Sequence, residues 1–384
     1  MVAGDREGGH RETIDEFGAV NSSASGHKQI WRQISTMSAL PPKVDIRRGL
    51  LDGRIVPDLN SRVGWESAKI IGRCCGEAER FQKSIAELAL VPKRWVSAAT
   101  KEWQITAVQE LSKDMRKMET RPGMSMAYQD HWFGEPWNVP ETVVMVHGNS
   151  ESSHAWTCWV PHFARHYRVV RPDLPGFGAT PEPAGYGWSA NELATDIGLL
   201  LDVLKIETCH LIGAKYGGSA CIRLAIDQPH RLSSLCLFGS PVRGSGSGNA
   251  DLIRTKGVRQ WAADTMRSRL GSAASEAQLK WWTDELMGKT GARAAYGASS
   301  SRIDMELQDE LPGITAPTLI VTTQESGLQS VAAVERYARM IPKSTVIVLP
   351  GDSYHIAAVE PDLCAQHALQ FIQQVSATHA RADE

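Results

Sequence analysis

The sequence lacks long apolar runs, an apolar leader and an excess of either charge. No stretch comes near about 18 consecutive apolar residues, so we expect no transmembrane helix. Residues 1–25 are charged and rich in glycine without an apolar segment, so a secretory signal is not expected either. The 41 basic and 43 acidic residues nearly balance, which leaves no basic footprint for a nucleic acid. We therefore expect neither a membrane nor a nucleic acid among the partners.

Cysteine is too sparse for a disulfide framework. Seven cysteines, an odd number, are scattered through the chain. The adjacent pair Cys74 and Cys75 has no His/Cys partner set at zinc spacing, so no metal site is predicted. Neither G-x-G-x-x-G nor a Walker pattern occurs, so nucleotide binding is not expected. These absences favour a reduced, cytoplasmic protein that uses no cofactor.

The composition is that of an ordinary globular protein. Of the 384 residues, 42% are hydrophobic and 22% are charged. The length suits one large α/β domain with extras, or two modest domains. In residues 1–112 the apolar residues show no sustained helical or strand periodicity. We therefore interpret this segment as a poorly ordered or regulatory N-terminal extension. Organised structure is expected from residue 113 onwards.

Strand patterns alternate with helix patterns after residue 113. Residues 142–146 are a continuous apolar run typical of a buried strand, and residues 124–128 predict an edge strand. Ser189 and Glu192 form a capping box at the start of a helix. Further strands are expected at residues 167–170, 232–238, 318–322 and 345–349, and a last helix at 361–375. This alternation predicts an α/β fold with a mostly parallel sheet flanked by helices.

Residues 242–313 break the alternation. They carry tryptophan, methionine and tyrosine on helix-length segments that glycine and serine separate. An insertion of this size at the carboxyl end of one strand is placed to act as a helical cap over a site. The expected organisation is therefore a core of residues 113–241 and 314–384, with residues 242–313 as the cap.

The chain is organised around residues 210–220, which read HLIGAKYGGSA. An apolar run stops at Gly213, and a helix-forming run starts after Gly217 and Gly218. A strand, a one-residue apex and a helix are the layout of a nucleophile elbow. The glycines allow a sharp turn, which exposes the apex side chain above a helix N-terminus. The apex residue is Lys215, where the G-x-S-x-G pattern has serine.

Several features, in the right order, make residues 120–376 resemble the α/β-hydrolase family. They are HGN at 147–149 after one strand, DLPGFG at 173–178 after the next, the elbow, the inserted cap and a late histidine. The run HGNSESSHAW at 147–156 is most similar to haloalkane dehalogenases and their cap-bearing, esterase-like relatives. The resemblance implies an α/β-hydrolase fold with a helical cap.

The resemblance also implies catalytic residues. The family order of nucleophile, acid and histidine places the histidine on His355, just past the last strand. The acid falls on Glu325, the only carboxylate in its turn, although the family spacing points equally to Ser326. A dehalogenase needs a carboxylate at the apex, so Lys215 disfavours that activity. We expect Lys215, His355 and Glu325 to be the catalytic residues.

Four further residues complete the expected site. The backbone N–H groups of Asn149 and Tyr216 are expected to form the oxyanion hole. His147 and Trp156 are expected to lie against the substrate, although His147 is also placed to brace the oxyanion loop. The substrate is expected to be a small molecule, and the oligomeric state stays open.

A lysine at the elbow favours amine chemistry. The helix N-terminus and burial under a cap both disfavour a cation, so the free amine of Lys215 is favoured. A neutral lysine that faces a carbonyl carbon can form a Schiff base, with His355 moving protons. We therefore expect a cofactor-free enzyme for a small organic carbonyl, ester or carboxylate compound, with C–C cleavage or decarboxylation as the sharper hypothesis.

Three alternatives remain at this point. Lys215 could stay charged and bind an anion while His355 serves as a general base. The scaffold could persist without turnover, as a catalytically inactive ligand-binding protein. Lys215 could also replace the nucleophile of an otherwise ordinary hydrolase.

Overall fold

The computed structural model describes residues 50–51, 54–55, 114–244, 246 and 248–382. The predicted N-terminal extension, residues 1–112, therefore lies outside the described residues, apart from one short strand pair. That pair is β1 (Leu50–Leu51) and β2 (Arg54–Ile55), which run antiparallel.

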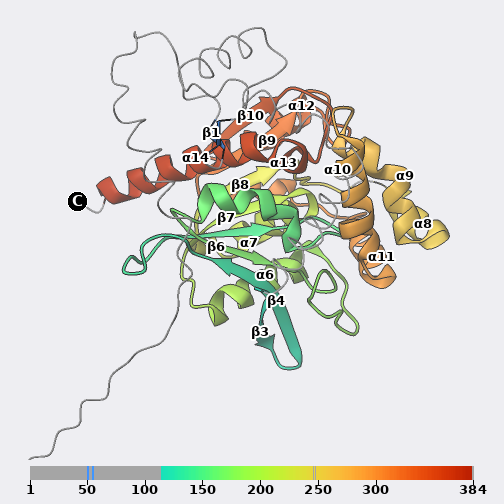
Figure 1. The fold of residues 1–384 in the computed structure, drawn as a ribbon, viewed down its shortest axis with the longest axis horizontal. Helices are drawn as coiled ribbons and strands as arrows, with labels where there is room; N and C mark the ends of the chain where they lie inside the picture. The colour runs from blue at the N-terminus through green and yellow to red at the C-terminus, as the bar shows by residue number, and fades with distance from the viewer. Residues whose placement is uncertain (1–49, 52–53, 56–113, 245, 247, 383–384) are drawn as a thin grey trace, which may run out of the picture. The chain divides into compact units, whose positions relative to one another are not determined.

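An eight-stranded sheet forms the centre of the described chain (Figure 1). Its strands are β3 (Arg116–Arg121), β4 (Met124–His131), β5 (Thr142–Val146), β6 (Arg168–Pro172), β7 (Cys209–Ala214), β8 (Leu232–Phe238), β9 (Thr318–Thr323) and β10 (Ser344–Leu349). The spatial order is β10-β9-β8-β7-β5-β6-β4-β3, in which β10 to β6 are parallel while β4 and β3 are antiparallel to their neighbours. The predicted mostly parallel α/β sheet is confirmed.

One strand was predicted at the wrong position in the sheet. The segment 124–128 was expected at the edge, but β4 lies between β6 and β3, so the edge strand is β3. The residues of β3 read RKMETR and are mostly exposed. An edge strand with charged side chains shows no alternating apolar face, which explains why the sequence pattern did not predict it.

Helices cover both faces of the sheet. Outside residues 248–300 they are η1 (Ser153–Trp159), α5 (Val160–Phe163), α6 (Ala190–Val203), α7 (Lys215–Asp227), η2 (Pro229–Arg231), η5 (Gln308–Gly313), α12 (Val331–Ala338), α13 (Ile356–Val359) and α14 (Pro361–Ala382). The predicted capping box is present, because the Ser189 hydroxyl accepts from the Glu192 N–H and the Glu192 carboxylate accepts from the Ser189 N–H. This box fixes the first residue of α6.

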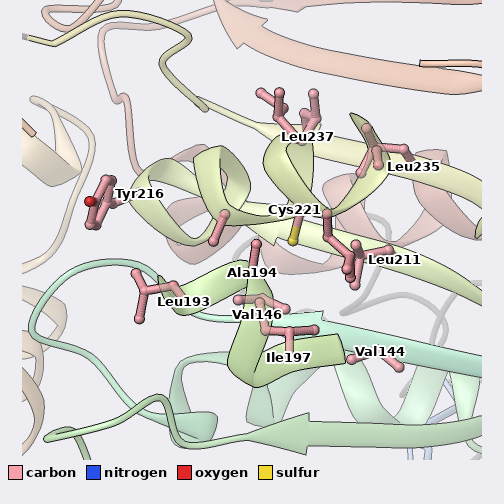
Figure 2. Close-up of a cluster of buried hydrophobic side chains, with 14 of the residues drawn as sticks. Val144, Val146, Leu193, Ala194, Ile197, Leu211, Tyr216, Cys221, Leu235 and Leu237 are labelled. Carbon is pink, nitrogen blue, oxygen red and sulfur yellow. The ribbon is translucent and has the colours of Figure 1, made fainter. Parts of the chain in front are cut away.

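The core is divided by the sheet into two buried clusters. Figure 2 shows one of them, in which Leu193 and Ile197 of α6 and Cys221 of α7 pack over Val146 of β5 and Leu211 of β7. The other cluster, on the opposite face, joins aromatic residues of η1 and α5 to small residues of α14. Both faces of the central strands are thus apolar, as expected for a parallel sheet covered by helices.

Residues 242–313, which we call the cap segment, lie between β8 and β9. They form α8 (Gly248–Lys256), α9 (Val258–Leu270), α10 (Glu276–Trp281), η3 (Trp282–Leu286), η4 (Met287–Lys289) and α11 (Ala292–Ser300), which gather at one side of the sheet (Figure 1). Trp261, Met266 and Trp282 belong to a third buried cluster of their own. Ala294 and Ala298 of α11 belong instead to the cluster shown in Figure 2, so the cap segment is joined to the core of the sheet through α11.

Candidate active site

The elbow places Lys215 at the sharp turn between β7 and α7. Lys215 has a φ of 49°, in the left-handed region that residues with a side chain rarely adopt. A Cβ at Gly217 would collide with the backbone oxygen of His147, and one at Gly218 would collide with the side chain of Ser240. The two glycines therefore let the helix start close against the neighbouring strand ends, and this holds the strained apex in place.

The Lys215 side chain is buried under the cap segment. Its amine forms an ion pair with the Oε1 atom of Glu151, and it lies 5.7 Å from the ring centroid of Trp282. Burial lowers the pKa of Lys215 well below its ordinary value, and the charges of Arg269 and Arg302 lower it further. Burial and the two arginines therefore disfavour the charged ammonium, whereas the Glu151 carboxylate beside it favours the charge.

Glu151 is the functional residue that the sequence reasoning missed. Its Oε2 atom accepts a hydrogen bond from the Gly148 N–H at 3.0 Å, and its side chain is only 2% exposed. Its Oε1 atom lies 3.4 Å from Nε2 of His355. A carboxylate in the loop after the buried strand β5 was the available signal, because that loop faces the elbow in this fold.

His355 lies just after β10, as predicted, and is 3% exposed. Its N–H bonds to the Ser353 hydroxyl at 3.0 Å and to the Arg269 backbone oxygen at 3.2 Å. The two ring nitrogens have no hydrogen-bond partner among the described residues. Burial lowers the pKa of His355 to about 3. The imidazole is therefore uncharged near neutral pH and free to accept a proton.

Among the described residues, no hydrogen bond joins Glu325 to His355, which was expected to be oriented by it. Glu325 is exposed in a turn, where its N–H bonds to the Gly351 backbone oxygen at 3.0 Å. At the end of β9 the buried residue is Thr323, whose hydroxyl donates to the Ser353 backbone oxygen at 2.9 Å. Thr323 is therefore the residue at the end of β9 that contacts the His355 loop. The Glu325 carboxylate lies in the following turn and is exposed to solvent.

The residues expected in the oxyanion hole flank the elbow. The Asn149 side-chain amide donates to the Ser299 hydroxyl of α11 at 2.9 Å, which ties the β5 loop to the cap segment. The Tyr216 hydroxyl donates to the Trp188 backbone oxygen at 2.7 Å. Both side chains have structural partners, so only the backbone N–H groups of Asn149 and Tyr216 are left for the predicted role. That role stays a prediction.

Of the two residues expected to bind substrate, only Trp156 lines the cavity. His147 is fully buried, its Nε2 atom accepts from the Leu174 N–H at 3.0 Å, and Nδ1 lies 2.8 Å from the Gly148 backbone oxygen. Burial lowers the pKa of His147 to about 4. His147 does not line the cavity, and backbone groups occupy both of its ring nitrogens, so its contact with a substrate stays a prediction.

The cavity beside Lys215 is small and mostly apolar. Its volume is about 20 Å³, which is enough for roughly one water molecule. It is lined by Glu151, Ala155, Trp156, Ala214, Lys215, Phe238, Trp282, Tyr354, His355, Ala357 and Ala358. Lys215 and Glu151 both belong to this lining and form an ion pair with each other.

Neither a metal site nor a membrane-spanning helix occurs among the described residues. Among the residues that the structure describes, no group of three or more His, Cys, Asp or Glu side chains could hold a metal ion. Within residues 114–382, apart from the gaps at 245 and 247, no helix has the length and apolar character needed to cross a bilayer.

Comparisons with known proteins agree on one fold. A family model described as the alpha/beta hydrolase fold matches residues 141–362. The chain is 29% identical over 228 residues to the pimeloyl-[acyl-carrier protein] methyl ester esterase of Aeromonas salmonicida, covering 55% of this chain and 87% of that protein. It is also similar in structure to an esterase from Thermogutta terrifontis, with a TM-score of 0.60, 22% identity, and coverage of 68% of this chain and 98% of that one.

A third relative matches over a shorter stretch. The 2-hydroxy-6-oxo-2,4-heptadienoate hydrolase of Pseudomonas putida is 31% identical over 133 residues. The match covers 34% of this chain and 46% of that enzyme, so the chain spans about half the length of this relative.

Proposed function

Because the chain belongs to the α/β-hydrolase family, we propose that it is a cofactor-free enzyme that acts on a small organic carbonyl compound through the amine of Lys215. One observation carries the proposal. The elbow apex bears a buried amine with a lowered pKa, beside the Glu151 carboxylate and the uncharged His355. The P. putida relative is named for a substrate that contains a ketone, which supports a carbonyl substrate.

The first step is Schiff-base formation. The lone pair of the uncharged Lys215 amine attacks the substrate carbonyl carbon, and a carbinolamine forms. Its hydroxyl group leaves as water after it takes a proton from Glu151, which has received the proton that the amine releases. Glu151 is held for this transfer, because its second oxygen accepts from the Gly148 N–H at 3.0 Å. The product is an imine between Lys215 and the substrate.

Bond cleavage follows when the substrate carries a hydroxyl group on the carbon β to the imine. The imine first takes a proton from water, then accepts the electron pair of the α–β carbon bond and becomes an enamine. His355 takes the hydroxyl proton, so that the β carbon leaves as an aldehyde or ketone. Protonation of the enamine at its α carbon and addition of water then release the second product and free Lys215.

Backbone donors assist the addition step in this proposal. The N–H groups of Asn149 and Tyr216 stabilise the oxygen while it carries negative charge. The small cavity requires the Glu151 side chain or the cap segment around Trp282 to move when a substrate enters, since the volume is about 20 Å³.

A second candidate function has its own support. Lys215 and Glu151 pair with each other beside a cavity of only about 20 Å³, which supports a family member that binds a ligand without turnover or has lost its activity. A third candidate is a hydrolase in which Lys215 replaces the nucleophile. In that case Lys215→Ser gains hydrolysis of 4-nitrophenyl acetate relative to Lys215→Ala.

Borohydride trapping tests the proposal. The chain is incubated with a panel of keto acids, ketones and aldehydes, reduced with borohydride, and examined by intact mass and peptide mapping. We expect a stable adduct on Lys215 that is absent from Lys215→Met. The control is Lys289→Met, which removes an exposed lysine of the cap segment that pairs with Glu285. An adduct that persists in Lys215→Met, or no adduct with any compound, would contradict amine catalysis.

A further inference from the structure

A buried tryptophan at the candidate active site has an unused hydrogen-bond donor. Trp156 belongs to η1, is 2% exposed and lines the cavity beside Lys215. Its indole Nε1 atom is buried and has no hydrogen-bond partner in the described part of the chain. A buried donor of this kind destabilises the fold unless a bound group accepts a hydrogen bond from it.

The other fully buried tryptophans of the described chain use the same donor. Each gives its indole N–H to an oxygen atom: Trp159 to the Ala357 backbone at 3.0 Å, Trp188 to the Pro175 backbone at 2.7 Å, and Trp261 to the Asn249 side chain at 2.9 Å. None of these three tryptophans lines the cavity. The unpartnered indole is therefore the one at the cavity, which points to a ligand as its partner.

Neighbouring contacts hold Trp156 beside the segment that carries His355. Its ring packs edge to face on Trp159, with 4.9 Å between the centroids and 89° between the planes. The bond from Trp159 to Ala357 ties η1 to α13, the helix that begins directly after His355. Trp156, Ala357 and His355 all line the same cavity. The indole donor is therefore fixed near the imidazole before any ligand enters.

His355 supplies the complementary group. Both of its ring nitrogens are buried and lack a hydrogen-bond partner within the described residues. Because burial keeps the imidazole uncharged near neutral pH, one of these nitrogens accepts a hydrogen bond. A hydroxyl group both accepts and donates, so one hydroxyl can accept from Trp156 and donate to His355. The cavity volume of about 20 Å³ suits a group of this size.

We propose that Trp156 binds the hydroxyl group of the substrate and directs the hydroxyl proton to His355. The inference rests on the proposed function, in which this hydroxyl lies on the carbon β to the carbonyl. It narrows the substrate class to small, uncharged β-hydroxy carbonyl compounds, because Phe238, Trp282 and alanines form most of the remaining lining. The indole keeps its own proton and stabilises the oxygen while His355 takes the hydroxyl proton.

Two ketones that differ in one group test the proposal. In 2-pentanone a methyl group replaces the β-hydroxyl of 4-hydroxy-2-butanone, and both present the same methyl ketone to Lys215. Calorimetry measures the affinity of the wild-type chain for each. We expect the hydroxy ketone to bind at least about ten-fold more tightly, because 2-pentanone leaves the indole and imidazole groups unpaired.

Trp156→Phe should reduce this preference to less than about three-fold, since it removes the donor. The comparison is made within each variant, so a change in cavity size affects both ketones. The control is Trp159→Phe, which removes the same atoms from a buried neighbour that does not line the cavity. This control should keep the full preference.

A second measurement follows the indole proton directly. In protein with isotope-labelled tryptophan, the resonance that Trp156→Phe removes is assigned to Trp156. We expect this resonance to move downfield when 4-hydroxy-2-butanone binds and to stay in place with 2-pentanone. A resonance that the hydroxy ketone does not move would contradict the hydrogen bond.

Two further outcomes would overturn the inference. One is equal affinity for the two ketones in the wild-type chain, a result that needs no variant to fold. The other is a hydroxyl preference that survives in Trp156→Phe. Borohydride trapping with the same ketones separates this inference from the proposed function. A hydroxyl preference without any adduct on Lys215 supports the role of Trp156 and contradicts amine catalysis, whereas equal affinity with adducts from both ketones does the reverse.

Discussion

Two buried histidines lie at opposite ends of the same sheet and differ in their hydrogen bonds. His210 is at the amino end of β7, where Nδ1 is 2.8 Å from the Ser234 hydroxyl and Nε2 is 3.5 Å from Glu141. His355 follows β10 at the carboxyl end, and its ring nitrogens have no hydrogen-bond partner among the described residues. Its Nε2 atom lies 3.4 Å from the Glu151 carboxylate, without a bond between them.

The difference separates a structural histidine from one that is available for chemistry. The His210 cluster also holds the last helix, because the Ser376 hydroxyl of α14 donates to Glu141 at 2.7 Å. The hydrogen bond from His210 lowers the pKa of Glu141, and the hydrogen bond from Ser376 lowers it by a smaller amount. A buried histidine with unsatisfied ring nitrogens destabilises the fold, so the His355 ring contributes less to stability than the hydrogen-bonded ring of His210.

The largest expected effect comes from His355→Ala. The variant removes the proton acceptor of the proposed reaction, so we expect turnover to fall by about 10²- to 10⁴-fold. The free energy of unfolding should change little or rise, since an unsatisfied polar ring is removed. Steady-state kinetics and urea unfolding on the same preparation check both points. Unchanged turnover would remove His355 from the mechanism.

His210→Ala should show the opposite behaviour. The substitution leaves a cavity and takes the partner from the buried Ser234 hydroxyl, so we expect a loss of about 2 to 4 kcal/mol in the free energy of unfolding. Turnover per folded molecule should stay unchanged, because His210 lies at the far end of β7. A loss of turnover without a loss of stability would contradict the division between the two ends of the sheet.

Glu151→Gln should give a smaller kinetic effect. The amide keeps the shape but removes the negative charge beside Lys215, so the pKa of the amine should fall further. We expect the pH midpoint of cyanoborohydride trapping to move to lower pH, and the maximal rate to fall by about ten-fold to a hundred-fold because the proton donor is lost. A pH profile identical to that of the wild-type chain would show that Glu151 does not share a proton with Lys215.

Stability should decrease in mild acid because of the two depressed histidines. Burial lowers the pKa of His147 to about 4 and that of His355 to about 3, from an ordinary value of 6.5. The unfolded chain therefore binds more protons than the folded chain as the pH falls below 6.5, and stability is lost in that direction. Each histidine contributes a slope of at most about 1.4 kcal/mol per pH unit. Urea titrations between pH 7 and 5 should show a shallower slope for His355→Ala, and an unchanged slope would contradict this account.

Glu325→Gln should have the smallest effect. Its carboxylate is exposed and away from His355, so turnover should match that of the wild-type chain and the free energy of unfolding should change by less than about 0.5 kcal/mol. Kinetics and thermal unfolding check this expectation. A ten-fold loss of turnover would restore Glu325 to the family's acid position.

The sequence predicted much of the fold and half of the candidate site. Apolar runs and the capping box before α6 placed most strands and helices, because their signals lie within a few neighbouring residues. The glycines after Lys215 identified the elbow, and the position after the last strand identified His355. The charged edge strand β3 was missed, since it has no buried face to leave a pattern.

Glu151 shows what local patterns leave out. It lies 64 positions before Lys215, and only the parallel pairing of β5 with β7 brings their carboxyl ends together. Thr323 is the last residue of β9, and Glu325 follows it in the next turn. Their spacing in the sequence does not determine which side chain is buried near the His355 loop, because packing decides this. Periodicity and turn chemistry thus establish the α/β sheet, its elbow and the lysine at the apex. The Glu151 partner of Lys215 and the lowered pKa of its amine come from burial between distant segments, because desolvation and charge pairing depend on neighbours in space.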